Sequence, residues 1–268
     1  MRGRDLRPIL RYHGGKWRLA KWIISHFPNH KIYVEPFGGA MSVLLQKPRS
    51  YAEVYNDLDG EIVNVFRVLR DDPDELFRLL ELTPFSRYDF NLSYEDTDSP
   101  LERARRTITR SFLGFGSAAA TKQTTGFRAN SNRSGTTPAG DWRNYPNHLR
   151  DAILRLQGVV LENKPYQEII ERHDTTKTLF YLDPPYTHNS RTSNKAYQFE
   201  MTNKDHIQLA HTLKNLKGEF VLSCYNSPLY TNLYKDYPQS SKNSLADNRL
   251  PRTETLIYSY IIQTQLAI

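Results

Sequence analysis

Residues 178–186 read Thr178-Leu179-Phe180-Tyr181-Leu182-Asp183-Pro184-Pro185-Tyr186, an apolar run that ends at an acid, two prolines and an aromatic ring. The apolar run is typical of a buried strand in a parallel sheet, and two prolines cannot continue a central strand. Ligands of open α/β sheets bind beyond the carboxyl ends of the strands. The stretch therefore predicts a site at whose mouth stand Asp183, the Pro184 carbonyl and the Tyr186 ring.

Short apolar segments on both sides of this stretch predict further strands of the same sheet. They lie at residues 32–34, 52–56, 159–163, 220–226 and 256–262. Helical patterns lie among them at residues 17–24, 41–45, 61–69, 168–170 and 203–216. Strands that alternate with helices in this way favour an α/β fold with a parallel sheet.

A glycine turn follows the first predicted strand in Glu35-Pro36-Phe37-Gly38-Gly39. A strand, a glycine-rich turn and a helix form the first unit of a nucleotide-binding fold, although a tight turn without a ligand is an alternative explanation. The full dinucleotide fingerprint of three glycines is absent, so a dinucleotide is not favoured. Asp57 ends the next predicted strand, where such folds bind ribose hydroxyls, whereas Asp59 fits better as the N-cap of the helix at 61–69.

A second glycine turn, Tyr12-His13-Gly14-Gly15-Lys16, precedes the first helical pattern. Such a turn brings backbone amides close to an anion, and Lys16 adds a positive charge. It is not a P-loop, because the earlier glycine and the Ser or Thr after the lysine are missing. A simple turn that leads into a helix is the alternative.

The charge of the 268-residue chain points to a polyanionic partner. The net charge is +7, from 36 basic and 29 acidic residues, and residues 101–155 alone carry ten basic against three acidic side chains. A localised basic region favours nucleic acid, although a solvated basic surface has the same composition. No apolar run is long enough to span a membrane and no apolar signal region follows the basic N-terminus, so we expect a cytoplasmic protein.

Cysteine and histidine usage argues against a metal site. Cys224 is the single cysteine, which excludes an intrachain disulfide framework and a cysteine-rich metal site. No pair of histidines has a zinc-binding spacing, so we expect no structural metal.

The interruption of the α/β pattern, at residues 71–155, predicts an inserted and mainly helical unit. Helical patterns cover residues 73–82 and 101–113, and residues 114–147 are rich in small polar residues. Arg and Asn side chains read guanine and adenine edges, so residues 127–135 are a candidate DNA-reading loop or, alternatively, a disordered surface loop. The candidate DNA contacts are Arg110, Lys122, Arg128, Asn130, Asn132 and Arg133. The polar residues 187–198 are a candidate clamp on the substrate or a solvated connector.

The order of these motifs along the chain resembles that of the Dam-type DNA adenine-specific (N6) methyltransferases. The motifs are the two glycine turns, Asn56-Asp57, the basic insert and Asp183-Pro184-Pro185-Tyr186. This resemblance covers nearly the whole chain. It implies a Rossmann-like class I methyltransferase sheet with a mainly helical DNA target-recognition insert. Residues 1–70 and 156–268 would form the S-adenosylmethionine-binding catalytic domain, and residues 71–155 the insert. It also implies double-stranded DNA with a short specific site as the partner.

The resemblance assigns roles to individual residues. The implied catalytic residues are Asp183, Pro184, Pro185 and Tyr186. The implied cofactor contacts are Tyr12, Lys16, Glu35, Phe37, Gly39, Asp57, Asn163, Tyr166 and Asp183. Two positions depart from the family pattern, because Met41 stands where a second glycine is expected and Pro165-Tyr166 where an Asp-Phe pair is expected. Tyr166 can still contact the cofactor adenine, and Glu162 or Asn163 is a candidate substitute for the missing acid.

The chemistry of an exocyclic adenine amine matches these residue types. Its lone pair is conjugated with the ring, and two acceptors, the Asp183 carboxylate and the Pro184 carbonyl, would draw its hydrogens and favour a pyramidal nitrogen. The base must leave the duplex, and Tyr186 offers a stacking face. One rival function is methylation of the cytosine amino group, and another is DNA binding without catalysis. Cys224 lacks the Pro-Cys context of enzymes that methylate a cytosine ring carbon.

Overall fold

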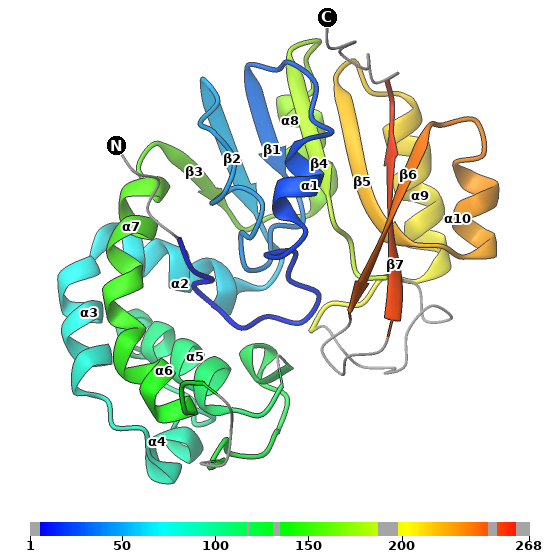
Figure 1. Ribbon diagram of the computed structural model, residues 1–268. Helices are drawn as coiled ribbons and strands as arrows, with labels where there is room; N and C mark the ends of the chain where they lie inside the picture. The colour runs from blue at the N-terminus through cyan, green and yellow to red at the C-terminus, as the bar shows by residue number, and fades with distance from the viewer. Residues whose placement is uncertain (1–5, 117, 131–134, 187–197, 246–250, 261–268) are drawn as a thin grey trace, which may run out of the picture.

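The sheet at the centre of the protein has seven strands in the order β3-β2-β1-β4-β5-β7-β6 (Figure 1). This computed structural model describes residues 6–116, 118–130, 135–186, 198–245 and 251–260. The strands are β1 Ile32–Glu35, β2 Ala52–Asn56, β3 Val159–Glu162, β4 Thr178–Leu182, β5 Glu219–Tyr225, β6 Gln239–Leu245 and β7 Pro251–Tyr258. Strands β3, β2, β1, β4 and β5 are parallel, and β7 runs antiparallel to both β5 and β6. The predicted α/β fold with a Rossmann-like sheet is confirmed.

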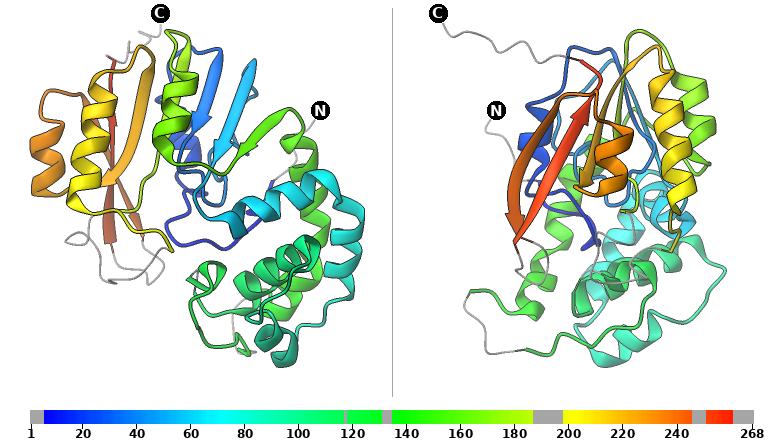
Figure 2. Two further views of the ribbon diagram at one scale, coloured as in Figure 1. Left: turned by 180° about the vertical axis from the view of Figure 1, so that it is seen from behind. Right: turned by 90° about the vertical axis from the view of Figure 1, so that its right-hand side faces the viewer.

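Helices cover both faces of the sheet. The helices before β3 are α1 Ala20–Ile24, α2 Gly60–Asp71, α3 Pro73–Leu82, α4 Arg87–Leu92, α5 Pro100–Leu113, α6 Pro138–Asn144 and α7 Pro146–Leu156. Those after β3 are α8 Tyr166–His173, α9 Asn203–Lys214 and α10 Pro228–Leu233. Helices α8, α9 and α10 lie on one face and α1 on the other (Figure 2).

Strand β4 occupies the middle of the sheet and is buried along its whole length. Successive side chains of a strand point to opposite faces, and Phe180 and Leu182 belong to the core under α8 and α9. Leu179 and Tyr181 belong to the core on the opposite face. The observed strand matches the predicted residues 178–182, so Asp183 stands at the carboxyl edge of the sheet.

Helices α3 to α7 lie together at one end of the sheet (Figures 1 and 2). The predicted helices at 73–82 and 101–113 are present, and the apolar core that contains Tyr55 of β2 continues without interruption into Ile108 and Trp142 of this region. The Trp142 indole donates a hydrogen bond to the Thr83 carbonyl at 2.8 Å, so even this polar group is satisfied in the core. The helical region and the sheet therefore share one apolar interior.

Several elements differ from the sequence-based expectation. Strand β6 has the polar sequence Gln-Ser-Ser-Lys-Asn-Ser-Leu, which carries no apolar signal because it is an edge strand held by the backbone pairing to β7. The last strand begins at Pro251 rather than at Leu256. Helices α6 and α7 are not among the predicted helices, because α6 lies within the polar stretch 114–147 and α7 begins at its end. Each begins with a proline in its first turn, which is a helix-start signal.

The expected helix at 41–45 is replaced by a series of turns, and Met41, where they begin, has a φ of 56°. This left-handed conformation costs an L residue about 1–2 kcal/mol and explains why glycine is expected at this position. The Met41 side chain is fully buried in the core. Packing therefore compensates for an unfavourable backbone.

We expect Met41→Gly to lower the free energy of unfolding despite relieving that backbone conformation. Loss of a buried methionine side chain costs about 2–5 kcal/mol, which exceeds the roughly 1–2 kcal/mol regained from the backbone. Urea unfolding of Met41→Gly and of Met41→Ala separates the two effects, since both lose the side chain and only glycine relieves the backbone. We expect Met41→Ala to be the less stable variant, and equal stability would contradict the role assigned to the backbone.

Candidate active site

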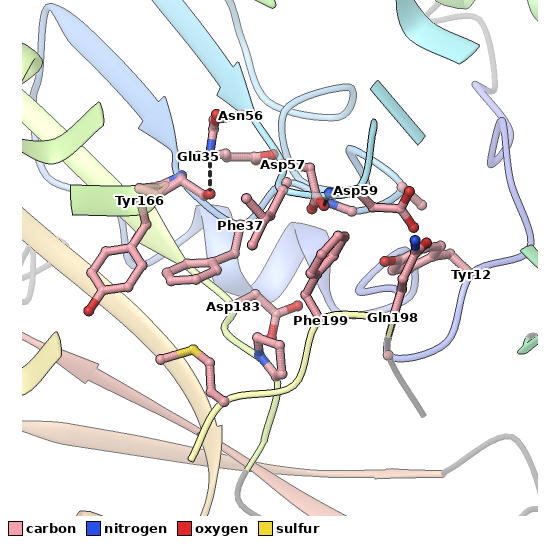
Figure 3. A pocket seen from close by; sticks show the side chains of 18 of the residues that line it. Tyr12, Glu35, Phe37, Asn56, Asp57, Asp59, Tyr166, Asp183, Gln198 and Phe199 are labelled. Carbon is pink, nitrogen blue, oxygen red and sulfur yellow. Dashed lines mark hydrogen bonds between the residues drawn. The ribbon is translucent and has the colours of Figure 1, made fainter. Parts of the chain in front are cut away.

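A cavity of about 300 Å³ opens at the carboxyl ends of β1, β2, β3 and β4 (Figure 3). Its walls come from segments that are far apart in the sequence: residues 12–16, 35–40, 56–59, 164–167 and 198–201. Asp183 and Asp205 also line it. The cavity lies where a parallel sheet binds its ligands and has the size of a small-molecule site.

Asp57 is held rigidly at the end of β2. The Gly39 amide donates to its Oδ2 at 2.8 Å and the Asp59 amide donates to its Oδ1 at 2.8 Å. Burial raises the pKa of Asp57 to about 6, and these backbone donors oppose the rise. Asp59 caps α2 by accepting from the Glu61 amide at 2.9 Å, as expected. Each Asp57 oxygen keeps lone pairs for a ligand, because a carboxylate has about four acceptor positions.

The two glycines after β1 are required for the packing of neighbouring tyrosine rings as well as for the access of a ligand to the cavity. A Cβ on Gly38 would lie 2.1 Å from the Tyr55 ring. Gly39 has a φ of +46°, and a Cβ there would lie 3.0 Å from the Tyr12 ring. Tyr12 and Gly39 both line the cavity. The expected glycine turn after β1 is therefore present, and the glycine turn at residues 12–16 packs against it.

Two aromatic rings form one wall of the cavity. The centroids of the Phe37 and Tyr166 rings lie 5.1 Å apart, and Figure 3 shows Tyr166 beside Phe37. Burial raises the pKa of Tyr166 to about 12, so its hydroxyl stays protonated. The Asn56 amide donates to the Pro36 carbonyl at 2.8 Å and to the Lys164 carbonyl at 3.0 Å, which ties the segments after β1 and β3 together. Asn56 was missed as a supporting residue although it adjoins Asp57.

Neither sequence-based substitute for the missing acid lines the cavity. The Asn163 amide donates to the backbone carbonyls of Asp57 at 2.7 Å and Leu58 at 3.1 Å, and Glu162 pairs with Arg172 at 3.3 Å. Asn163 therefore supports the Asp57 loop from behind, which corrects its assignment as a cofactor contact. The carboxylate that does reach the cavity near Tyr166 is Asp205, in the first turn of α9.

The buried Lys16 and the partly exposed Asp183 form an ion pair at the end of β4. The Lys16 ammonium lies 3.0 Å from Asp183 Oδ2 and donates to the Gly14 carbonyl at 2.8 Å. Burial raises the pKa of Asp183 to about 6, and the Lys16 charge opposes that rise. The sequence placed both residues at the site, but the direct contact between them is a finding of the structure.

Tyr186 does not present a stacking face to the cavity. Its ring is buried against Tyr225 at a centroid distance of 4.3 Å, and its hydroxyl donates to Glu254 at 2.5 Å. The expectation that Tyr186 stacks on a base is therefore not met in this arrangement. Phe199 lines the cavity with 43% of its surface exposed, and Figure 3 shows it pointing into the same cavity as Asp183.

The remaining predicted site residues differ in their access to the cavity. Pro185 lines it, whereas Pro184 is buried. Glu35 lines it too and accepts a hydrogen bond from the Tyr33 hydroxyl at 2.6 Å. Burial raises the pKa of Glu35 to about 8, so this carboxyl holds its proton at neutral pH in the absence of a cation.

One predicted DNA contact is wrong. Arg110 is 3% exposed, and its guanidinium donates to the backbone carbonyls of Ser93 at 3.2 Å and Ala120 at 3.4 Å. A buried guanidinium needs such acceptors, so Arg110 fixes the end of α5 instead of contacting a ligand. Arg128 also has a structural partner, because it donates to the Phe112 carbonyl at 2.8 Å.

The other candidate DNA contacts lie on the surface or outside the described residues. Asn130 is exposed, and Lys122 is partly exposed and pairs with Asp96. Asn132 and Arg133 lie outside the described residues, as do residues 187–197 of the predicted clamp.

Over the part of the chain that the structure describes, no group of three or more His, Cys, Asp or Glu residues has an arrangement suited to a metal ion. The helices described there include none that is long and apolar enough to cross a membrane. Cys224 is buried in β5, and burial raises the pKa of its thiol, so it is not a reactive thiolate.

Comparison with known proteins identifies relatives of this chain. Residues 12–247 match the family model for D12 class N6 adenine-specific DNA methyltransferases. A type II methyltransferase of Lactococcus lactis subsp. cremoris, M1.LlaDCHI, is 30% identical over 87% of this chain and 86% of its own length. M.MjaIII, a type II methyltransferase of Methanocaldococcus jannaschii, is 25% identical over 87% of this chain and 89% of its own length. A DNA adenine methylase of Haemophilus influenzae is 26% identical over 70% of this chain and 66% of its own length.

Proposed function

This chain belongs to the D12 class of N6 adenine-specific DNA methyltransferases, and from that premise we propose how its residues divide the reaction. The enzyme transfers a methyl group from S-adenosylmethionine to the amino group of adenine in DNA. The observation that carries the residue assignment is the Lys16–Asp183 pair, which stands at the cavity that Asp57, Phe37 and Tyr166 also line.

The cavity fits the cofactor in three respects. The Phe37 and Tyr166 rings suit the adenine, and the backbone-held Asp57 carboxylate suits the ribose hydroxyls. Tyr12, Lys16 and Glu35 line the part assigned to the amino-acid end, where Glu35 would lose its proton to face the cofactor ammonium. When bound, S-adenosylmethionine supplies an electrophilic methyl group on its sulfonium.

Asp205 takes the place of the expected acid beside the cofactor adenine. Its Oδ2 accepts from the amide and the hydroxyl of Thr202, both at 2.7 Å, in a capping box at the start of α9. These contacts hold the carboxylate and occupy one oxygen, so Oδ1 remains available to an amino group. The lowered pKa of Asp205, caused first by the Thr202 hydroxyl, keeps it ionised at neutral pH.

Asp205→Ala is expected to remove most of the preference for the adenine amino group. Titration calorimetry would compare S-adenosylhomocysteine with S-inosylhomocysteine, in which a carbonyl replaces the amine. We expect wild type to prefer the adenosyl compound by about tenfold or more, equal to one charge-assisted hydrogen bond. Thr202→Ala, which also breaks the capping box, is the control and should keep the preference. An undiminished preference in Asp205→Ala would place the adenine contact elsewhere.

The target adenine is proposed to enter the cavity extruded from the duplex, with its amine at Asp183. The Asp183 carboxylate and the Pro184 carbonyl accept the two amine hydrogens, and the prolines fix the backbone that directs that carbonyl. Both acceptors draw the hydrogens out of the ring plane, which frees the nitrogen lone pair for an in-line attack on the methyl carbon as the bond from that carbon to sulfur breaks. The methylated nitrogen then loses one proton to the Asp183 carboxylate. Phe199, exposed at the cavity, replaces Tyr186 as the ring proposed to stack on the base.

The helical region at residues 71–155 is proposed to be the DNA target-recognition insert, and residues 1–70 with 156–268 the catalytic domain. Support comes from the basic excess of residues 101–155 and from the position of α3–α7 at one end of the sheet (Figure 1). Double-stranded DNA with a short specific site is the proposed substrate. A role in the cytoplasm follows from that substrate, and the type II relatives favour a part in restriction-modification.

The experiment that tests this function supplies methyl-labelled S-adenosylmethionine and unmethylated DNA of mixed sequence, followed by digestion to nucleosides. Label is expected in N6-methyladenosine. Label in N4-methylcytidine would support the rival amino-group chemistry, and DNA binding without label would indicate an inactive relative. Sequencing of the methylated positions then defines the target site.

A further inference from the structure

Glu254 is a buried carboxylate beside the catalytic ion pair, and no part of the scheme above uses it. Strand β7 runs antiparallel to β5, so that Glu254 pairs in register with Tyr225 at the carboxyl end of β5. The start of β7 thus lies at the same sheet edge as the ends of the parallel strands. This topology brings a residue from the far end of the chain to Lys16 and Asp183.

One oxygen of Glu254 collects three polar contacts. Its Oε1 accepts from the Tyr186 hydroxyl at 2.5 Å and from the Ser223 hydroxyl at 2.5 Å, and the Lys16 ammonium lies 3.8 Å away. The side chain is 3% exposed. A carboxylate at this depth needs such partners to be stable, and in turn it fixes their orientation.

The contacts of Lys16 extend this cluster to Asp183. The ammonium lies 4.8 Å from the Tyr186 ring centroid and 3.0 Å from Asp183 Oδ2, so Glu254 and Asp183 share one cation. Two carboxylates around a single ammonium leave an excess of negative charge at the place where a cationic methyl donor must approach.

We propose that Glu254 is a positioning residue for methyl transfer, which holds Tyr186 and Lys16 and through Lys16 orients and electrostatically tunes the Asp183 carboxylate. This inference rests on the function proposed for the Lys16–Asp183 pair. Through the contact of its hydroxyl with Glu254, Tyr186 takes part in the support of the acceptor group.

The pH dependence of the cluster depends on the charged and titratable groups in and around it. The cluster itself contains Lys16, Asp183, Tyr186 and Glu254, and the groups that face it are Tyr181, Cys224, Tyr225, Tyr230 and Arg252. Burial raises the pKa of Tyr181, Cys224, Tyr225 and Tyr230, so these groups stay protonated near neutrality. The pKa of Asp183, about 6, falls in the working range.

The carboxylates of Glu254 and Asp183 carry like charges, and this determines how Glu254 shifts the pKa of Asp183. The Glu254 charge raises the pKa of Asp183, whereas the Lys16 charge lowers it. Protonated Asp183 cannot accept from the amine as a carboxylate does, so kcat/KM should fall as the pH drops through about 6. This fall in kcat/KM on the acid side is the acid limb of the pH profile. Removal of the Glu254 charge should move the acid limb to lower pH.

The test measures kcat/KM for DNA between pH 5 and 8.5 in wild type, Glu254→Gln and Glu254→Asp. We expect Glu254→Gln to lower the plateau at least tenfold and to shift the acid limb to lower pH, with the Kd for S-adenosylmethionine within about threefold of wild type. Glu254→Asp retains the charge, so its limb should stay near the wild-type position even where its plateau falls.

Glu53→Gln serves as the matched control. Glu53 is equally buried and accepts from Lys47 at 2.8 Å, but it lies at the start of β2 and does not line the cavity. The Glu53→Gln substitution should lower the melting temperature without moving the acid limb of the pH profile. A wild-type profile in Glu254→Gln, or equal losses in Glu254→Gln and Glu254→Asp with an unmoved limb, would overturn the proposal. A wild type that transfers no methyl to adenine overturns instead the function proposed for the pair.

Discussion

Asp183→Ala is expected to lower the rate of methyl transfer by a factor on the order of 10³ while the Kd for S-adenosylmethionine stays within about threefold of wild type. The substitution removes the proposed acceptor for one amine hydrogen, so the target nitrogen keeps its lone pair in conjugation with the ring. It also leaves the buried Lys16 without its partner at 3.0 Å. Single-turnover transfer from labelled cofactor, together with calorimetric cofactor binding, measures both quantities.

A control must separate lost chemistry from the loss of one of the two carboxylates around Lys16. Lys16→Met combined with Asp183→Ala removes both charges of the ion pair but also takes the cation from Glu254, 3.8 Å away, so its melting temperature should recover only in part. Its transfer rate should remain low, because no carboxylate is restored. Turnover near the wild-type rate in either variant would remove Asp183 from the mechanism.

Asp57→Ala is expected to weaken S-adenosylmethionine binding by about 100-fold, the equivalent of one charged hydrogen-bonding group toward the ribose. The substitution also deletes the acceptor for the Gly39 and Asp59 amides, which lie 2.8 Å from the two carboxylate oxygens. The glycine turn after β1 therefore loses its tie to the end of β2. Calorimetry with S-adenosylmethionine and with S-adenosylhomocysteine should show the same loss for both, since the ribose is common to them.

Asn163→Ala is the matched control for Asp57. Its amide donates to the backbone carbonyls of Asp57 and Leu58 from outside the cavity, so cofactor affinity should change by less than about threefold. If Asn163→Ala weakens binding as much as Asp57→Ala, then loop rigidity determines the affinity. If Asp57→Ala binds like wild type, the ribose lies elsewhere.

The sequence was sufficient for the parts of the site whose signals are local. Strand β4 and Asp183 could be predicted because five buried residues, four of them apolar, are followed by Asp183 and then by two prolines, and the pattern coincides with the strand. Asp59 was identified as the cap of α2 because a short acid precedes a helical pattern. In each case the physical cause lies within a few residues of the feature.

Residues placed by long-range pairing were missed. Glu254 reaches the site only because β7 returns antiparallel to β5, and the polar edge strand β6 that completes the hairpin carries no periodic signal. Asp205 enters the cavity at the start of a helix that reads as an ordinary amphipathic element. Arg110 was misassigned for the opposite reason, since composition counts a basic residue as a surface charge whether or not backbone carbonyls bind it in the interior.

The uninterrupted apolar core between the sheet and helices α3–α7 bears on how this enzyme can evolve. Side chains such as Trp142 and Ile108 share an interior with Tyr55, which packs under the glycine turn of the cofactor cavity. The inner faces of these helices cannot change without disturbing that turn. A lineage that acquires a new DNA target is therefore confined to the outward surface and connecting loops of the region, so drift in specificity should leave its inner helix faces nearly fixed.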